Sequence, residues 1–232
     1  MDTQRINICD EDASFECTIR FPPIGFSEFK EYVEEFECKL LYLIYEDEDS
    51  EGEEKVIGKL HGYRFSLYDC YRDYDEDKVD ALLPLDILDM IDDNVARLMC
   101  LFEDASYIKP KYFKKWQNIL DLDLPEITPN IILINRVEVL AEYRGRRFGE
   151  SLISNSLYTI SRRNDLVIVD AMPLQFWHKS LQNKWEEEMR LGDLEQDKKK
   201  ARETLNKYYR KLGFKQLTKD GLLFLALPQL RL

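Results

Sequence analysis

The sequence lacks paired cysteines and long apolar runs. Its five cysteines, at positions 9, 17, 38, 70 and 100, are never separated by only two residues, so the Cys-x-x-Cys motifs of metal and redox sites are excluded, and we expect no metal. The odd number of cysteines and a polar, acidic N-terminal segment in place of a signal peptide predict reduced thiols in a soluble, cytoplasmic protein. No apolar run approaches the ~20 residues of a membrane span.

Positively charged residues are also fewer than negatively charged ones. The chain has 33 Lys and Arg residues against 45 Asp and Glu residues, which gives a formal net charge of -12. A field of this sign repels a phosphate backbone, so nucleic acid is not an expected partner. A hydrophobic fraction of 44% with 12% aromatic residues is typical of a folded globular protein. We expect one domain over residues 1–232, with halves at 1–130 and 131–232.

The pattern of apolar residues predicts a mixed α/β protein with a strand, a helix and a strand at its centre. Residues 131–140 form a nearly continuous apolar run, which is typical of a strand covered on both faces. A hairpin with an acidic tip at 46–54 is predicted in the N-terminal half. Strands are predicted over 15–21, 39–45, 56–67, 131–140, 166–171 and 222–227, and helices over 27–36, 85–101, 111–120, 150–160, 176–190 and 194–212.

The segment 135–150, NRVEVLAEYRGRRFGE, combines a buried strand, an arginine-rich turn and the start of a helix. A helix N-terminus offers unpaired backbone N–H groups and the positive end of the helix dipole, so it attracts anions. Arg144, Arg146 and Arg147 surround this point, and Gly149 would let the backbone approach a phosphate closely. The segment therefore predicts a pyrophosphate or other polyanion site, with a solvated basic turn as the alternative.

The same turn resembles the acyl-CoA-binding motif of the GNAT acetyltransferase superfamily, (Gln/Arg)-x-x-Gly-x-(Gly/Ala). Arg144 matches the leading residue, Gly149 matches the closing residue, and Val139 matches a valine that often precedes the motif. Arg147 stands where the family has its central glycine. The resemblance implies acetyl-CoA, or another acyl-CoA, as the co-substrate. It assigns cofactor binding to Val137, Val139, Arg144, Gly145, Arg146, Arg147, Phe148, Gly149 and Glu150, with the strand splayed at 137–139 to bind the pantetheine arm.

Two further segments are similar to this superfamily. Residues 209–214, YRKLGF, resemble its Tyr-x-x-x-Gly-Phe segment, and they follow the arginine turn in the family's order. Residues 170–175, DAMPLQ, resemble a largely uncharacterised bacterial branch. The resemblance covers residues 131–227, and it implies a central mixed, mostly antiparallel twisted sheet flanked by helices.

The resemblance also implies two catalytic residues. Tyr209 matches the family tyrosine that protonates the departing thiolate, with a packing role as the alternative. Glu138 is a candidate general base acting through water, with a solvent-facing carboxylate or a substrate anchor as the alternatives. Asp170, at the end of a buried strand, is the second candidate for the general base. His178 is a candidate for facing the acceptor pocket, with a surface helix position as the alternative, whereas His61 is expected to be structural.

The sequence thus predicts an N-acyltransferase that transfers an acyl group from the thioester to a primary amine. The acceptor is expected to be a small amine or a protein amino group, and the acidity of the N-terminal half favours a cationic one. A catalytically inactive CoA-binding or regulatory module of the same fold is the alternative. A site for another nucleotide ranks last, because neither a Walker motif nor GxGxxG is present. No membrane partner is expected, and a homodimer is left open.

Overall fold

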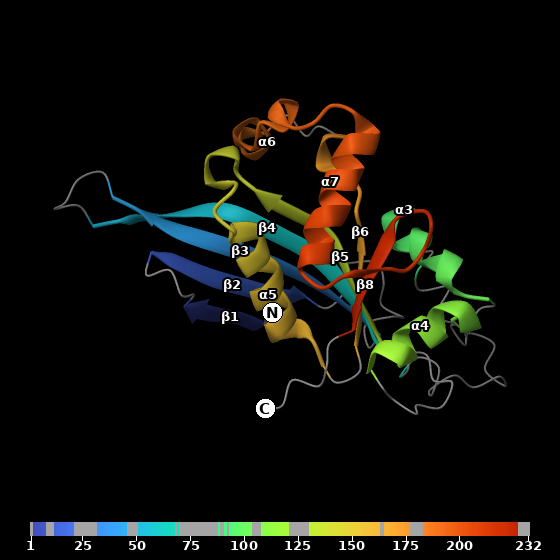
Figure 1. The fold of residues 1–232 in the computed structure, drawn as a ribbon. Coiled ribbons are helices and arrows are strands. Elements are labelled where there is room, and N and C mark those ends of the chain that lie inside the picture. The colour runs from blue at the N-terminus through green and yellow to red at the C-terminus, as the bar shows by residue number, and fades with distance from the viewer. Residues whose placement is uncertain are drawn as a thin grey trace.

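A computed structural model describes residues 2–7, 12–20, 32–45, 51–67, 69, 88, 91, 93–103, 108–120, 130–162, 165–176 and 183–226. Within them, eight strands form one sheet in the order β1-β2-β3-β4-β5-β6-β8-β7 (Figure 1). Neighbouring strands are antiparallel except β5 and β6, which are parallel. The strands are β1 (Asp2–Asn7), β2 (Ala13–Arg20), β3 (Val33–Ile44), β4 (Glu53–Phe65), β5 (Ile131–Val139), β6 (Leu166–Asp170), β7 (Lys215–Gln216) and β8 (Leu222–Ala226). The protein is therefore a mixed α/β structure with a mostly antiparallel sheet, as predicted.

Helices cover both faces of the sheet. Figure 1 shows α5 and α7 over one face, whereas α3 and α4 lie beside the β6–β8 side of the sheet. The helical elements are α3 (Asp93–Ala96), η2 (Arg97–Leu101), α4 (Pro110–Leu120), η3 (Ala141–Tyr143), α5 (Phe148–Ile160), η4 (Leu174–Phe176), α6 (Lys184–Met189), η5 (Leu191–Asp193) and α7 (Lys198–Lys211).

Strand β5 contributes to the hydrophobic cores on both sides. Side chains of a strand alternate between the faces of a sheet. Accordingly, Ile132 and Ile134 pack in one buried cluster with residues of α5 and α7. Ile131 and Leu133 pack in the other cluster, with residues of α3, η2 and α4. This explains why the sequence of β5 begins as an uninterrupted apolar run.

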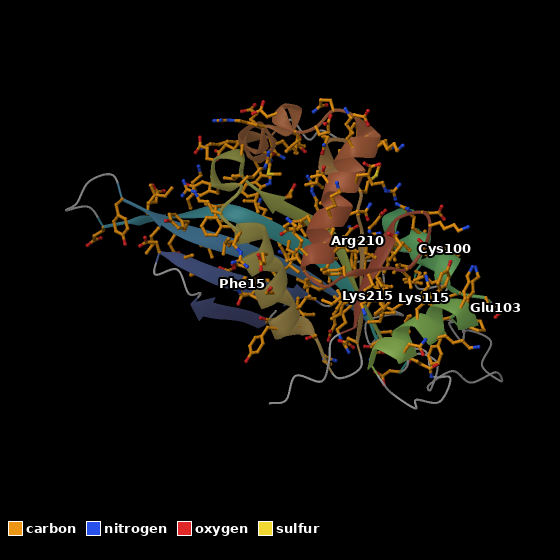
Figure 2. The ribbon with its side chains drawn as sticks, viewed as in Figure 1. Phe15, Cys100, Glu103, Lys115, Arg210 and Lys215 are labelled. Atoms are coloured by element: carbon orange, nitrogen blue, oxygen red, sulfur yellow. The ribbon has the colours of Figure 1, made fainter. Side chains whose placement is uncertain are left out.

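Individual side chains illustrate how β2, β3 and α4 are held in the fold. Phe15 of β2 is fully buried in the cluster that α5 covers (Figure 2). Lys115 of α4 donates from Nζ to the carbonyl of Leu217 at 3.0 Å, which joins α4 to the turn between β7 and β8. Cys17 and Cys38 face one another across β2 and β3, and both are free thiols.

One prediction for the N-terminal half was wrong, and one strand there was not predicted. The predicted helix 27–36 is replaced from Val33 onward by strand β3, in which Phe36, Cys38 and Leu40 are buried at a period of two. Pairing with two neighbouring strands overrides the local helical spacing. Strand β1 was not predicted, because an edge strand pairs through its backbone and needs no apolar alternation in sequence.

Most other predicted elements were confirmed within a few residues. The predicted helix 85–101 corresponds in its described part to α3 and η2, and the predicted helix 176–190 to the end of η4 and to α6. Residues 27–31, 46–50, 85–87 and 177–182 lie outside the described part. None of the helices in the described residues has the length and apolarity that a membrane span requires.

Candidate functional site

The parallel strands β5 and β6 separate halfway along β5. Their pairing runs from Ile131 with Leu166 to Ile134 with Val169. Beyond Ile134, β5 continues to Val139 with β4 as its registered partner in the described sheet. The two strands therefore enclose a V-shaped opening, and backbone groups of β5 that point toward β6 are available there for a ligand.

An extra residue in β5 changes the direction of the side chains inside this opening. His61 of β4 pairs with Arg136 and Gly62 pairs with Ile134, so Asn135 is a bulge between them. A bulge of one residue reverses the alternation that follows. Val137 and Val139 therefore join the α5 and α7 side of the sheet, where they contact the buried cluster. Glu138 instead shares the opposite face with its register partner Lys59.

A cavity of about 520 Å³ occupies the opening on the side of α7. This volume falls in the range of about 300–1,000 Å³ that is usual for small-molecule sites. Most of its lining comes from three segments: Asn135, Arg136, Val137 and Val139 of β5; Asp170, Met172, Pro173, Leu174 and Gln175 at and after the end of β6; and Ala201, Thr204, Leu205, Tyr208 and Tyr209 of α7. Arg144, Gly149, Met189, Leu194 and Glu195 complete the wall.

The N-terminus of α5 lies beside this cavity. Arg147 is its N-cap residue, makes no capping hydrogen bond with its side chain, and has the left-handed backbone angles φ 64° and ψ 9°. Gly145 is also left-handed, at φ 79°. The backbone at Arg147 thus has the conformation that favours glycine. The amides of the first helical turn, including that of Gly149 in the cavity wall, are those that a helix cannot satisfy itself.

The three predicted arginines have different environments. Arg144 is half-buried and donates from Nε to the carbonyl of Val139 at 3.0 Å and from Nη2 to the carbonyl of Met189. It therefore joins the end of β5 to α6 and is engaged by the protein itself. Arg147 makes two hydrogen bonds to Glu150, at 2.8 and 2.7 Å. Arg146 is exposed, with its guanidinium 5.9 Å from the centre of the Tyr143 ring.

Gly149 lies close to a side chain of α7. A Cβ added to Gly149 would lie 2.9 Å from the hydroxyl oxygen of Tyr208, closer than real Cβ contacts come. Tyr208 also lines the cavity, and burial raises its pKa to about 12. Tyr208 was not among the predicted site residues. The helical spacing from Ala201 through Leu205 to Tyr208 is the signal that could have identified it.

Tyr209 lies in the cavity wall as well. It is buried at 5% exposure and packs edge-on against Tyr208 and Phe214. Burial is the main cause that raises the pKa of its hydroxyl above the ordinary value, so the group remains protonated at neutral pH. Both alternatives from the sequence, a packing residue and a proton donor, are compatible with this position.

The two carboxylate candidates differ in their partners. Glu138 is only 6% exposed, so the alternative of a solvent-facing carboxylate was wrong. Its Oε2 accepts a hydrogen bond of 3.1 Å from Trp185 Nε1, and Arg136 pairs with its Oε1. Asp170 lines the large cavity, but it is ion-paired with Arg97 and with Arg202. Through these two ion pairs, Asp170 connects η2 with α7.

The other residues near the arginine turn and the strands of the site make structural contacts or lie outside the described residues. Phe148 is buried beneath the arginine turn and contacts the ring of Tyr42, so it supports the turn through packing. His61 hydrogen-bonds Glu35 at 2.8 Å. Asp197, in the basic segment 197–202, caps α7 by accepting from the backbone of Lys199 and Lys200. His178 lies outside the described residues.

Comparison of the chain with models of protein families, with curated proteins and with solved structures gave no match.

Proposed function

We propose that this protein is an acyl-CoA-dependent N-acyltransferase of the GNAT type, with acetyl-CoA as the expected co-substrate. One observation carries the proposal: two parallel strands separate beyond Ile134, in the part of β5 that leads to the arginine turn, and a cavity of about 520 Å³ lies in the opening. A pantetheine arm is a narrow chain with amide groups, and it suits a mostly apolar opening lined by unpaired strand backbone.

The N-terminus of α5 supports the proposal because it is suited to bind the phosphate groups of CoA. The unsatisfied amides of the first turn and the helix dipole favour an anion there. Arg146 and Arg147 are exposed on the same turn and can approach a pyrophosphate from solvent. Arg144 has the different role of bracing the turn against α6.

The chemistry assigned to the chain needs few groups. A CoA thioester supplies the activated acyl group. Tyr209, or its neighbour Tyr208, is the proposed donor of a proton to the departing sulfur, since both line the cavity and both hydroxyls are protonated at neutral pH. Backbone N–H groups of the separated part of β5 would hold the oxygen that gains negative charge during transfer.

A CoA-binding module without turnover is the second candidate. The observation that favours it is the pairing of both carboxylates near the site, because Asp170 is held by two arginines and Glu138 by Arg136 and Trp185. In this candidate acetyl-CoA binds, but no amine is acylated. A transfer assay that follows release of the CoA thiol with a broad set of amines separates the two.

Calorimetry with acetyl-CoA tests the proposal directly. Thr204 of α7 lines the cavity, so Thr204→Trp would place a large ring in the opening. We expect stoichiometric binding by the wild-type protein and a loss of affinity of about tenfold or more for Thr204→Trp. Glu203→Trp is the matched control, since Glu203 is the adjacent exposed residue and does not line the cavity.

Each result of the calorimetry leads to a different conclusion. If the wild-type protein does not bind acetyl-CoA at millimolar concentration, the proposal is wrong. Equal weakening by the two tryptophan variants would place the ligand elsewhere. Arg146→Gln and Arg147→Gln should each weaken binding modestly and reduce its sensitivity to salt, because exposed charges are screened by ions.

A further inference from the structure

A second cavity lies on the opposite face of β5. Its volume is about 270 Å³, roughly half that of the first. Whereas the first cavity is mostly apolar, the second is lined almost entirely by polar and charged side chains: Glu37, Lys59, His61, Asn135, Arg136 and Glu138. Both cavities include Asn135 and Arg136 in their walls, so they meet at the bulge of β5.

The bulge at Asn135 brings these charges together. Register pairs place His61 opposite Arg136 and Lys59 opposite Glu138 on one face of the sheet. Without the extra residue, Arg136 and Glu138 would point toward α7 and the apolar cavity. The chain thus places Arg136 and Glu138, two residues apart in β5, on the face of the sheet opposite to Val137 and Val139.

Positive and negative groups are balanced within the second cavity. Glu138 is buried and bound by Arg136 and by Trp185. The ammonium of Lys59 lies 4.0 Å from the centre of the Trp185 ring, and within the described residues it has no carboxylate partner. Glu37 contributes a second carboxylate on the neighbouring strand, where it pairs with Lys39 at the surface.

This balance differs from the expectation of a cationic acceptor, which was based on the acidity of the N-terminal half. A cation alone would leave Lys59 facing a like charge in a confined space, which is unfavourable. A ligand with one positive and one negative group would pair its negative group with Lys59. Its positive group would share the carboxylates of Glu138 and Glu37 with the cations that already contact them. The volume of about 270 Å³ lies below the range usual for drug-sized ligands, so it suits a molecule of the size of an amino acid.

We propose that the second cavity binds the acceptor and that the acceptor is a small aminocarboxylate, such as a free amino acid. This inference rests on the proposed function. Lys59 pairs with the acceptor carboxylate, while Glu138 and Glu37 attract its ammonium group. The amine then approaches the thioester carbonyl at the level of Asn135, where the two cavities meet and β6 no longer covers the edge of β5.

The transfer step balances without a further reactant. The bound ammonium first loses one proton to solvent, and the neutral nitrogen attacks the thioester carbonyl carbon. A C–N bond forms and the C–S bond breaks, and the thiolate takes its proton from a cavity tyrosine. The second proton of the attacking nitrogen restores that tyrosine through water. The products are an N-acyl amino acid and free CoA thiol, and one proton is released to solvent.

A transfer assay with matched acceptors tests the inference. Free L-amino acids are compared with their methyl esters, which keep the amine and lack the carboxylate, and product is measured as released CoA thiol and by mass. We expect the free acids to exceed the esters in kcat/KM by about tenfold or more, since a lost charged contact in a confined site discriminates strongly. Lys59→Met should remove this preference through KM, with the esters little affected.

Lys55→Met is the control, because Lys55 lies on the same strand, pairs with Glu188 and does not line the cavity. Esters that react as well as the free acids, an unchanged preference in Lys59→Met, or no reaction of any amino acid by a protein that binds acetyl-CoA would each overturn the inference.

Binding without the co-substrate separates this inference from the proposed function. Saturation-transfer NMR of free amino acids against their methyl esters needs no acetyl-CoA. Selective binding of the free acids that Lys59→Met abolishes supports the polar cavity as an aminocarboxylate site even if calorimetry shows no acetyl-CoA binding. Equal signals from acids and esters would overturn it, whatever the result with acetyl-CoA.

Discussion

The two sides of β5 beyond Asn135 differ in almost every respect. On the side of α7, Val137 and Val139 border a large and mostly apolar cavity. On the other side, Glu138 borders a cavity about half as large, where it is paired with Arg136, which borders both cavities. A single strand of nine residues can therefore border two chemically different cavities, because its successive side chains point to opposite faces of the sheet.

Deletion of Asn135 should remove the difference between the two faces of β5 most completely. Without the bulge, Arg136 and Glu138 would turn into the apolar side, where their charges lose their partners. We expect a loss of at least ~3 kcal/mol in the free energy of unfolding, measured by urea denaturation, together with loss of acetyl-CoA binding. Asn135→Gly keeps the residue count, so it should retain most of the stability. A deletion variant as stable as Asn135→Gly would contradict the role given to the bulge.

Removal of the buried carboxylate should affect only the polar side. Glu138→Ala leaves the indole N–H of Trp185 and the guanidinium of Arg136 without this acceptor. A cost of about 1–3 kcal/mol in the free energy of unfolding is expected, with acetyl-CoA affinity nearly unchanged. Glu138→Gln preserves an acceptor for Trp185 and should cost less. If both variants weaken acetyl-CoA binding as strongly as Thr204→Trp, the two sides are not separate.

Alkaline pH should affect the apolar side. Burial raises the pKa of Tyr208 from its ordinary value of 10 to about 12, and that of Tyr209 is raised further. Folding therefore favours the protonated hydroxyls. Their contribution is complete below pH 10 and declines as the pH rises toward 12. Urea denaturation at pH 9 and pH 11 should show this decline, and Tyr208→Phe should reduce it; an identical decline in the variant would exclude Tyr208 as a cause.

The smallest effect is expected at Arg147. Its left-handed backbone costs a side chain about 1 kcal/mol, and glycine would relieve this cost while adding freedom to the unfolded chain. Arg147→Gly should therefore change the free energy of unfolding by less than ~1 kcal/mol, whereas Arg147→Val should destabilise the protein by more. Thermal denaturation of both variants checks this order. Equal stability of the glycine and valine variants would contradict it.

Local patterns were sufficient to predict most elements of the C-terminal half. The apolar run of β5, the arginine turn and the stripe of α5 are contiguous in sequence, so periodicity and capping rules apply to them directly. Val33 and Phe36 were misassigned because their helical spacing is also compatible with a strand, and only pairing with distant residues decides between the two.

The details of the candidate site depend on contacts that the sequence does not reveal. The bulge at Asn135 has no signature of its own, so the direction of Glu138 could not be predicted from the strand. The carbonyl of Met189 that binds Arg144 is 45 residues away, and Trp185, which binds Glu138, is 47 residues away. The arginine turn was predicted as a site, but the separate roles of its arginines were not.

The parallel pairing of β5 and β6 has a consequence for how the site is connected. Two parallel neighbours cannot be joined by a tight hairpin, so the chain must return along the sheet before it starts the second strand. Here α5 makes that return, and its first turn is the proposed phosphate site. The two walls of the opening are thus linked covalently through the helix that faces the ligand. A ligand held at the start of α5 would fix the width of the opening, so hydrogen exchange should slow in β5, α5 and β6 together.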